Sequence, residues 1–146
     1  MIGPSPKRAI DSFTGAYFFP SNFFEIGIDF EGIRYPSVEN AYQAGKFPPS
    51  ERVTLGFTTC SAAEAKRKGK GVKHKYDTLV LMEELVRQKF TKGHLAHRLL
   101  DTGDCELIEG NWWHDYFWGV YNGVGQNNLG KILMRVREEI RKGIVK

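Results

Sequence analysis

Prolines divide the first third of this chain into short segments that no long helix or strand can cross. Pro20 interrupts one apolar run, Pro36 ends an extended run at 24–35, and a double proline at 48–49 stops the segment that follows. Proline lacks the backbone N–H and clashes with the preceding turn, so it ends regular elements. The elements of this region are therefore expected to be short.

Between these breaks, the hydrophobic patterns predict an α+β fold that is mostly helical, with a small sheet or hairpin. Residues 24–35 alternate apolar and polar side chains around a Glu-Gly turn, which predicts a β-hairpin. Capping side chains (Ser37, Ser61, Asp77, and Asn127 or Asn128) and apolar positions at helical spacing predict the helices. The predicted helices are at 37–47, 61–69, 77–90, 94–101 and 129–142, and further strands are predicted at 15–19 and 106–109.

The chain has 146 residues, which suits one domain with a sizeable core. Residues 1–12 contain two prolines and are expected to be a flexible lead-in, and 13–146 to form a single compact domain. The sequence shows no repeat, low-complexity tract or linker.

The formal net charge of +4 favours anionic partners such as phosphates, nucleotides or nucleic acid. The densest basic run is 66–70, for which a solvated helix end is the simpler interpretation, because cations suit the negative end of the helix dipole.

Two cysteines without CxxC spacing are typical of a reduced, cytoplasmic protein. His94 and His97 could share a helical face, but no cysteine or carboxylate pattern completes a metal site, so neither metal nor cofactor is expected. No apolar segment has the length of a signal peptide core or of a membrane span of ~18 residues. A cytoplasmic location without membrane contact is the expectation.

The predicted helix at 37–47 carries the first candidate site. Residues at i, i+4 and i+7 share one helical face, which aligns Glu39, Gln43 and Lys46. A solvated polar stripe is the ordinary interpretation of such a pattern. The helix is short, however, and aromatic residues flank it on both sides, which favours a face that lines a cleft.

The second candidate is the irregular segment 110–131, which is rich in glycine, asparagine and aromatics. A long loop of this kind is functional or disordered, and its aromatic content argues against disorder. Asp115 lies among aromatic residues, so a dry and unpaired carboxylate there would have a raised pKa suited to acid–base chemistry. The alternatives are that Asp115 caps the loop and that Gly123 and Gly125 serve tight packing.

A third candidate is the turn at Ser21, Asn22 and Phe23. It is either a plain turn or a corner that binds a base through an amide and an aromatic ring.

Taken together, these segments resemble the NADAR family, also called YbiA-like proteins. The matching motifs are SNF at 21–23, SVENAYQAGKF at 37–47, AKRKG at 65–69, LLDTGDCELIE at 99–109, D-x-x-W-G at 115–119 and G-x-G-x-N-x-L-G-K-x-L-M at 123–134. They follow the family's order and cover nearly the whole chain after residue 13. Two positions depart from the family pattern: Asn40 stands where histidine is frequent, and Tyr76 where tryptophan is frequent. Asn40 puts a histidine-dependent proton step in doubt.

The resemblance implies an enzyme, an N-glycosidase that cleaves a base-like amine from ribose phosphate. The leading substrate is ADP-ribose attached to guanine in DNA or RNA, and the alternative substrates are ribosylamino-pyrimidine phosphates of the riboflavin pathway. Two rival hypotheses are a non-catalytic module that binds ADP-ribose or nucleotides, and a nucleic-acid-binding protein that acts through Lys66 to Lys70.

Cleaving a ribose–nitrogen bond passes through an oxocarbenium-like state, which carboxylates stabilise. Glu39 and Asp115 are the predicted catalytic carboxylates, and Lys46 is predicted either to form a Schiff base or to bind phosphate. The remaining predicted contacts to substrate stack on a base, read a ring edge or approach phosphate: Ser21, Asn22, Phe23, Gln43, Trp113, Trp118, Gly119, Gly123, Gly125 and Asn127.

Overall fold

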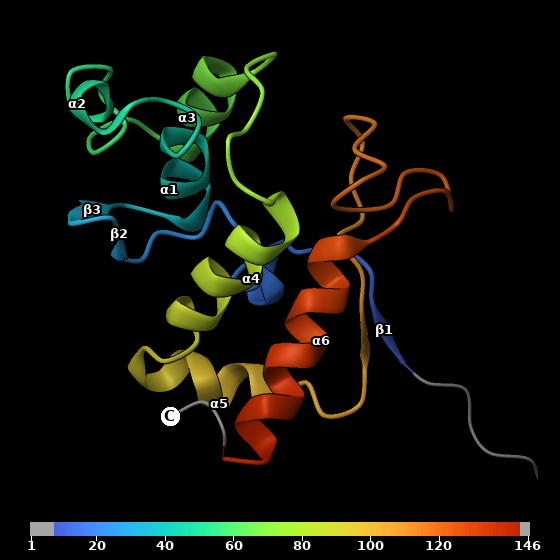
Figure 1. The fold of residues 1–146 in the computed structure, drawn as a ribbon. Helices are drawn as coiled ribbons and strands as arrows, with labels where there is room; N and C mark the ends of the chain where they lie inside the picture. The colour runs from blue at the N-terminus through green and yellow to red at the C-terminus, as the bar shows by residue number, and fades with distance from the viewer. Residues whose placement is uncertain (1–7, 144–146) are drawn as a thin grey trace, which may run out of the picture. The chain divides into compact units, whose positions relative to one another are not determined.

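The computed structural model describes residues 8–143, which form two compact units (Figure 1). One unit is Asn22–Lys92, and the other combines Met1–Ser21 with Gly93–Lys146. Each unit contains helices and a two-stranded sheet, so the predicted α+β class is confirmed. The single domain at 13–146 stays a prediction.

The unit Asn22–Lys92 begins with the predicted hairpin. Strands β2 (Ile28–Phe30) and β3 (Ile33–Tyr35) pair antiparallel, with Ile28 opposite Tyr35. Their connection is Glu31-Gly32, and both residues have positive φ, of 48° and 82°, as a two-residue hairpin turn requires. Ile28 and Tyr35 are fully buried on one face, so the alternation in the sequence marks the buried side.

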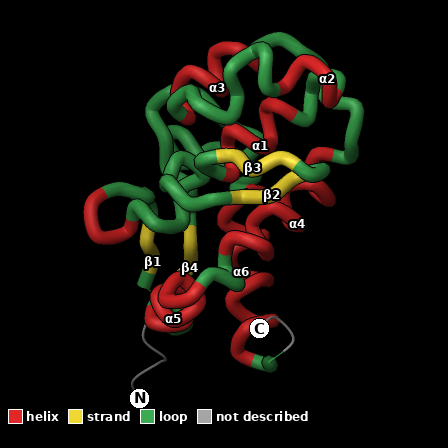
Figure 2. The backbone as a smooth tube through the Cα atoms, turned by 90° about the vertical axis from the view of Figure 1, so that its left-hand side faces the viewer, coloured by secondary structure: helices red, strands yellow, loops and turns green. Residues whose placement is uncertain are grey.

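Four helices complete this unit: α1 (Val38–Ala44), α2 (Pro49–Arg52), α3 (Ala62–Gly69) and α4 (Thr78–Lys89). The predicted caps are present, since Ser37, Ser61 and Asp77 each accept hydrogen bonds from backbone N–H groups of the following turn. Helix α1 packs against α3, α4 and the hairpin, and Figure 2 shows it beside β2 and β3. As a result, every residue of α1 is buried.

Helix α1 ends earlier than predicted, and α2 was not predicted at all. The chain leaves α1 at Ala44 but continues in tight turns, in which the Lys46 N–H donates to the Gln43 carbonyl at 3.1 Å. The double proline then starts α2 as well as stopping α1, because proline is well placed in the first turn of a helix.

The second unit contains β1 (Ala9–Ile10), the 3-10 helix η1 (Gly15–Tyr17), α5 (Gly93–Asp101), β4 (Glu106–Leu107) and α6 (Asn128–Arg141). Strands β1 and β4 pair in parallel. The strand predicted at 15–19 is wrong, since these residues turn into η1. Part of the predicted lead-in, 1–7, lies outside the described residues, while Ala9 and Ile10 form a strand.

Helix α6 buries the predicted apolar stripe through Leu129, Ile132, Leu133 and Val136. Among residues 8–143, no helix combines the length and the apolar character needed to cross a membrane. The same residues contain no cluster of three His, Cys, Asp or Glu side chains arranged to hold a metal ion.

Candidate active site

The polar face of α1 is buried, so the solvated stripe does not exist. Glu39 is 8% exposed and Gln43 is 6% exposed. One turn apart on the helix, the Gln43 Nε2 group donates a hydrogen bond of 3.0 Å to Glu39 Oε1. A buried carboxylate held by an amide donor has a fixed orientation, as a group that acts on a bound substrate requires.

Lys46 lies beside this pair and is partly buried. Its Nζ donates a 3.0 Å hydrogen bond to the Gly69 carbonyl and lies 5.8 Å from the centre of the Tyr42 ring. Burial lowers the pKa of Lys46 below its ordinary value, and the charge of Glu39 acts in the opposite direction. A lysine with a lowered pKa reaches its neutral, nucleophilic form more readily.

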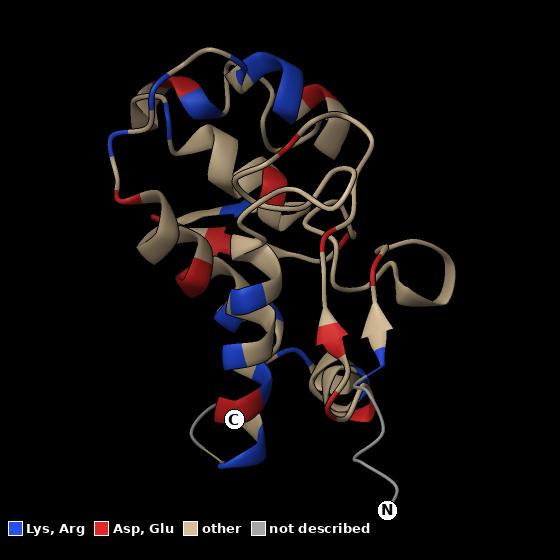
Figure 3. Cartoon of the chain, turned by 90° about the vertical axis from the view of Figure 1, so that its right-hand side faces the viewer, with Lys and Arg blue, Asp and Glu red and all other residues tan. Residues whose placement is uncertain are grey.

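The immediate surroundings of the Lys46 amine carry negative charge. Gly69 is the last residue of α3, whose final carbonyls have no partner within the helix and form the negative end of its dipole. Glu39 adds a carboxylate. These groups disfavour a phosphate at this point, although Lys66, Arg67 and Lys68 in the last turn of α3 offset part of the helix dipole. Figure 3 shows the basic positions along α3 and the loop after it.

The structure brings the predicted corner Asn22-Phe23 to the start of α1. The Asn22 carbonyl accepts a hydrogen bond of 3.1 Å from the Glu39 N–H. The Asn22 side chain is buried, its Nδ2 donates to Met82 Sδ at 3.4 Å, and its Oδ1 has no hydrogen-bond partner among the described residues. A buried amide oxygen without a partner suits an N–H donor of a ligand. Lys66 Nζ lies 5.9 Å from the centre of the Phe23 ring.

Asn40 has a structural role that sequence reasoning did not identify. It is fully buried, and its Nδ2 donates to the carbonyls of Phe57 at 3.0 Å and Cys60 at 2.9 Å. Its Oδ1 accepts a 2.6 Å hydrogen bond from the Ser37 hydroxyl. Asn40 therefore binds the backbone at Phe57 and Cys60 to α1. Its amide cannot act as the proton-transfer group that a histidine at this position would provide.

His74 contacts α1 through Tyr42, and the centres of the two rings lie 4.8 Å apart. The Tyr76 N–H donates to His74 Nδ1 at 3.3 Å, so the other ring nitrogen, Nε2, carries the proton that bonds the Tyr42 carbonyl at 2.9 Å. Burial lowers the pKa of His74, with the hydrogen bond to Tyr42 acting in the opposite direction. A neutral ring with both nitrogens engaged is a packing group.

In the other unit, the Asp115 carboxylate caps its own loop. Its Oδ1 accepts hydrogen bonds from the N–H groups of Phe117 at 3.1 Å and Trp118 at 2.8 Å. The Asn111 side chain holds the backbone of Asp115 from both sides, with each hydrogen bond at 2.9 Å. These contacts match the capping alternative, and the catalytic role of Asp115 stays a prediction.

Close packing of the backbone requires glycine at two positions of this loop, Gly119 and Gly125. A Cβ on Gly119 would overlap the Glu109 carbonyl oxygen, and a Cβ on Gly125, whose φ is 146°, would overlap the Gly119 carbonyl oxygen. Gly123 has φ of 76° and nothing within 4 Å of its Cβ position, so it serves a turn and faces open space. A phosphate contact by these glycines stays a prediction.

Asn127 occupies the N-cap position of α6 but does not cap the helix with its side chain. Its Oδ1 accepts from the Glu109 N–H and its Nδ2 donates to the Leu107 carbonyl, both at 2.9 Å. The amide therefore joins β4 to the start of α6. Since both of its groups are engaged, a phosphate contact by this side chain would replace one of these bonds.

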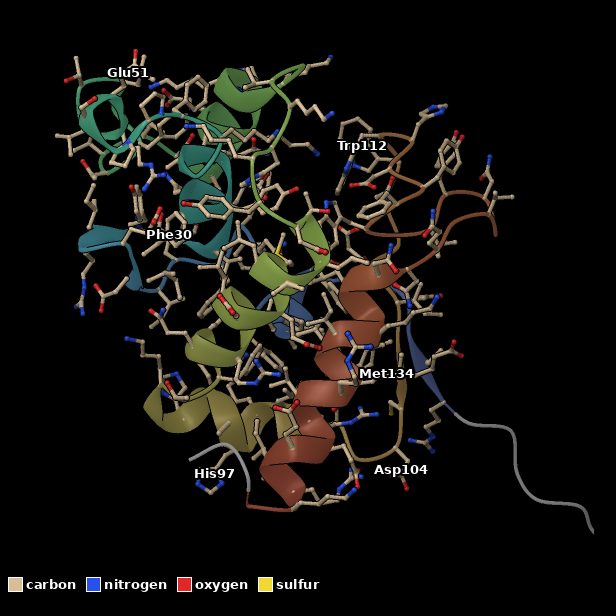
Figure 4. All side chains as sticks on the ribbon, viewed as in Figure 1. Phe30, Glu51, His97, Asp104, Trp112 and Met134 are labelled. Carbon is tan, nitrogen blue, oxygen red and sulfur yellow. The ribbon has the colours of Figure 1, made fainter. Side chains whose placement is uncertain are left out.

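Several aromatic rings on the loop before α6 are open to solvent. Trp113 is 40% exposed, while Trp112, which sequence reasoning passed over, is 79% exposed and labelled in Figure 4. Their rings meet edge to face at 5.6 Å. Trp118 is only partly exposed. Ser21 lies in this unit too, and its N–H donates to the Phe18 carbonyl at 2.9 Å.

Of the predicted site residues, five lie within the unit Asn22–Lys92: Asn22, Phe23, Glu39, Gln43 and Lys46. Asp115 and the loop glycines belong to the other unit, and each group is described within its own unit.

Comparison with known proteins identifies the class. Residues 9–141 match the NADAR domain, and the chain belongs to the NADAR family. The NMR structure of YbiA from E. coli matches with a TM-score of 0.79 and 27% sequence identity, covering 96% of this chain and 89% of that one.

Two curated relatives extend the comparison. An N-glycosidase of Nostoc punctiforme is 36% identical, covering 83% of this chain and 84% of its own length. A riboflavin biosynthesis protein of Vibrio vulnificus is 40% identical over 85% of this chain, but the match spans only 36% of that longer protein.

Proposed function

We propose that this protein is an N-glycosidase that cleaves a ribose–nitrogen bond, with Glu39 and Lys46 as its central catalytic groups. The observation that carries the proposal is the buried hydrogen-bonded pair of Glu39 and Gln43, with the Lys46 amine next to it. The relatives named N-glycosidase, from Nostoc punctiforme and E. coli, support the reaction type.

Glu39 has the properties that stabilise an oxocarbenium-like state. Positive charge develops at ribose C1 as the bond to nitrogen breaks, and a carboxylate in a water-poor setting stabilises that charge more strongly than one in water. Gln43 keeps the carboxylate oriented through its 3.0 Å hydrogen bond. Asp115 is proposed as a second carboxylate that assists the departing nitrogen or the incoming water.

For Lys46 we favour covalent attack over phosphate binding, because Glu39 and the Gly69 carbonyl surround its amine with negative charge. The neutral amine attacks ribose C1 while the C1–N bond breaks. The electrons of the broken bond leave with the departing nitrogen, which takes up a proton. Opening of the sugar ring transfers a proton to the ring oxygen and leaves an imine between Lys46 and C1. Water adds to this imine, and its collapse restores the free lysine and the ribose aldehyde.

The proposed substrate is ADP-ribose attached to guanine in nucleic acid. The net charge of +4 and the basic positions along α3 support a polyanionic substrate, and Asn22, Phe23, Trp113 and Trp118 are proposed to bind its base or adenine. A second candidate is a ribosylamino-pyrimidine phosphate of the riboflavin pathway. The Vibrio vulnificus relative, which is named a riboflavin biosynthesis protein, favours this candidate.

A parallel assay separates these possibilities. The protein is incubated with ADP-ribosylated guanine DNA or RNA and, separately, with the ribosylamino-pyrimidine phosphate, and release of ADP-ribose or of free pyrimidine is followed. Faster release of ADP-ribose supports ADP-ribosylated guanine as the substrate. Turnover of the pyrimidine compound alone would make the ribosylamino-pyrimidine phosphate the leading candidate instead. Tight binding of ADP-ribose without release from either compound would contradict the enzymatic proposal and favour a binding module.

A further inference from the structure

Gly69 lies next to Gln43 and Lys46, the two residues whose side chains are beside Glu39. It is the last residue of α3 and is buried, and it contacts both Gln43 and Lys46 of the segment that begins with α1. In the sequence Gly69 ends the AKRKG motif, but no pattern there indicates its contact with another helix.

The Gln43 side chain occupies the space that any larger residue at position 69 would need. A Cβ on Gly69 would overlap Gln43 Oε1 and lie 2.7 Å from Gln43 Cδ. The φ of Gly69 lies outside the positive range that favours glycine, so an alanine could adopt the same backbone conformation. The requirement for glycine therefore comes from Gln43 and not from the backbone.

The Gly69 carbonyl has a separate contact with Lys46. It accepts the 3.0 Å hydrogen bond from Lys46 Nζ and a second hydrogen bond, of 3.1 Å, from the Val72 N–H beyond the end of α3. One residue thus limits where Gln43 lies and where the resting amine of Lys46 lies.

We propose that Gly69 is a positioning residue, which keeps Gln43 against Glu39 and holds the amine of Lys46 ready beside that carboxylate. The inference rests on the proposed function, because it assigns Gly69 to the same reaction. It adds that the end of α3, and not α1 alone, sets the geometry of the reacting groups.

A double-mutant cycle tests this role. Gly69→Ala is expected to lower kcat by about tenfold or more with little change in KM, because the new methyl pushes Gln43 away from Glu39. In a Gln43→Ala background the same change should cost less than about threefold, since the side chain that it displaces is gone. Gly27→Ala is the matched control, because a Cβ there meets only the flexible end of Arg34.

A second measurement does not depend on activity. In the wild-type protein, the NMR resonances of the Gln43 side-chain amide should follow the ionisation of Glu39, to which it donates. This response should be lost in Gly69→Ala and kept in Gly27→Ala.

The outcomes separate the two proposals. An equal loss of kcat from Gly69→Ala with and without Gln43, or an unchanged amide response, would overturn the role of Gly69. Absence of glycosidase activity in the wild type, with the amide response lost in Gly69→Ala as expected, would overturn the proposed function and leave the positioning contact standing.

Discussion

The Gln43 amide and the Glu39 carboxylate meet at 3.0 Å across one turn of α1, and both side chains are buried. A charged and an amide group one turn apart are common on exposed helices, where their interaction contributes ~0.5 kcal/mol or less. Inside the protein the same contact satisfies a carboxylate that water does not reach freely. The contact therefore orients Glu39 for chemistry more than it stabilises the helix.

The role of Lys46 can be tested by two substitutions. Lys46→Arg keeps the positive charge but removes the nucleophile, so covalent attack predicts that Lys46→Arg and Lys46→Ala both lower kcat by on the order of a hundredfold or more. Reduction with borohydride during turnover should leave the reduced ADP-ribose, or ribose phosphate for the second candidate substrate, attached to Lys46 in the wild type alone, where mass spectrometry detects it. Lys70→Arg, at an exposed position just after α3, is the control. Near-normal activity in Lys46→Arg would instead support phosphate binding.

Asp115→Asn separates loop capping from catalysis. An asparagine Oδ1 can accept the same two hydrogen bonds from Phe117 and Trp118, so the thermal midpoint should change little. If the carboxylate takes part in the reaction, kcat should fall by about tenfold or more. Unchanged kcat with an unchanged midpoint would show that Asp115 only caps its loop.

Asn40→Ala is expected to destabilise the fold. It leaves the buried carbonyl of Phe57 and the partly buried carbonyl of Cys60 without this donor and removes the acceptor of the Ser37 hydroxyl. Unsatisfied buried polar groups cost about 1–3 kcal/mol each, so the free energy of unfolding should fall by roughly 2–4 kcal/mol in urea denaturation. Ser50→Ala, at an exposed site in α2, should have little effect. A loss below about 0.5 kcal/mol for Asn40→Ala would contradict the anchoring role.

Lys89 makes stability depend on pH. Burial lowers its pKa to about 7, and its Nζ lies 5.3 Å and 5.4 Å from the ring centres of Phe24 and Phe90. The unfolded chain, with an ordinary pKa, binds the proton more tightly than the folded one between pH 7 and about 10.5. Below pH 7 the buried Lys89 ammonium therefore destabilises the folded state to its full extent. Between pH 7 and about 10.5 the free energy of unfolding rises with pH.

Lys89→Met removes this penalty while keeping a long side chain in the core. The free energy of unfolding should increase at pH 7 by on the order of a few kcal/mol, and the gain should shrink as the pH is raised to 9. Denaturation at several pH values measures the effect, with the exposed Lys70→Met as the control. An equal effect at pH 7 and pH 9 would show that the Lys89 amine is not the titrating group.

Local signals in the sequence predicted much of the fold. Ser37, Ser61 and Asp77 cap their helices as predicted, and the Glu31-Gly32 turn closes the hairpin, because these features depend on side chains within a few residues of one another. The buried apolar face of α6 could be predicted in the same way, because the helical spacing of its apolar residues is a local pattern.

The features that depend on distant parts of the chain could not be predicted. The burial of Glu39 and Gln43 depends on how α3, α4 and the hairpin surround α1, and no pattern within α1 encodes this. Asn127 was expected to cap α6, but its side chain bonds the Glu109 N–H and the Leu107 carbonyl of β4 instead. The contact of Gly69 with Gln43 likewise joins residues of different helices.

The central claim is that the buried Glu39 carboxylate takes part in cleaving a ribose–nitrogen bond. Its most direct test compares wild type with Glu39→Gln in the release of ADP-ribose from modified guanine and of pyrimidine from its ribosyl phosphate. We predict that Glu39→Gln lowers turnover of the active substrate by at least about a hundredfold while the thermal midpoint stays within a few degrees. Turnover by Glu39→Gln at the wild-type rate would contradict the account.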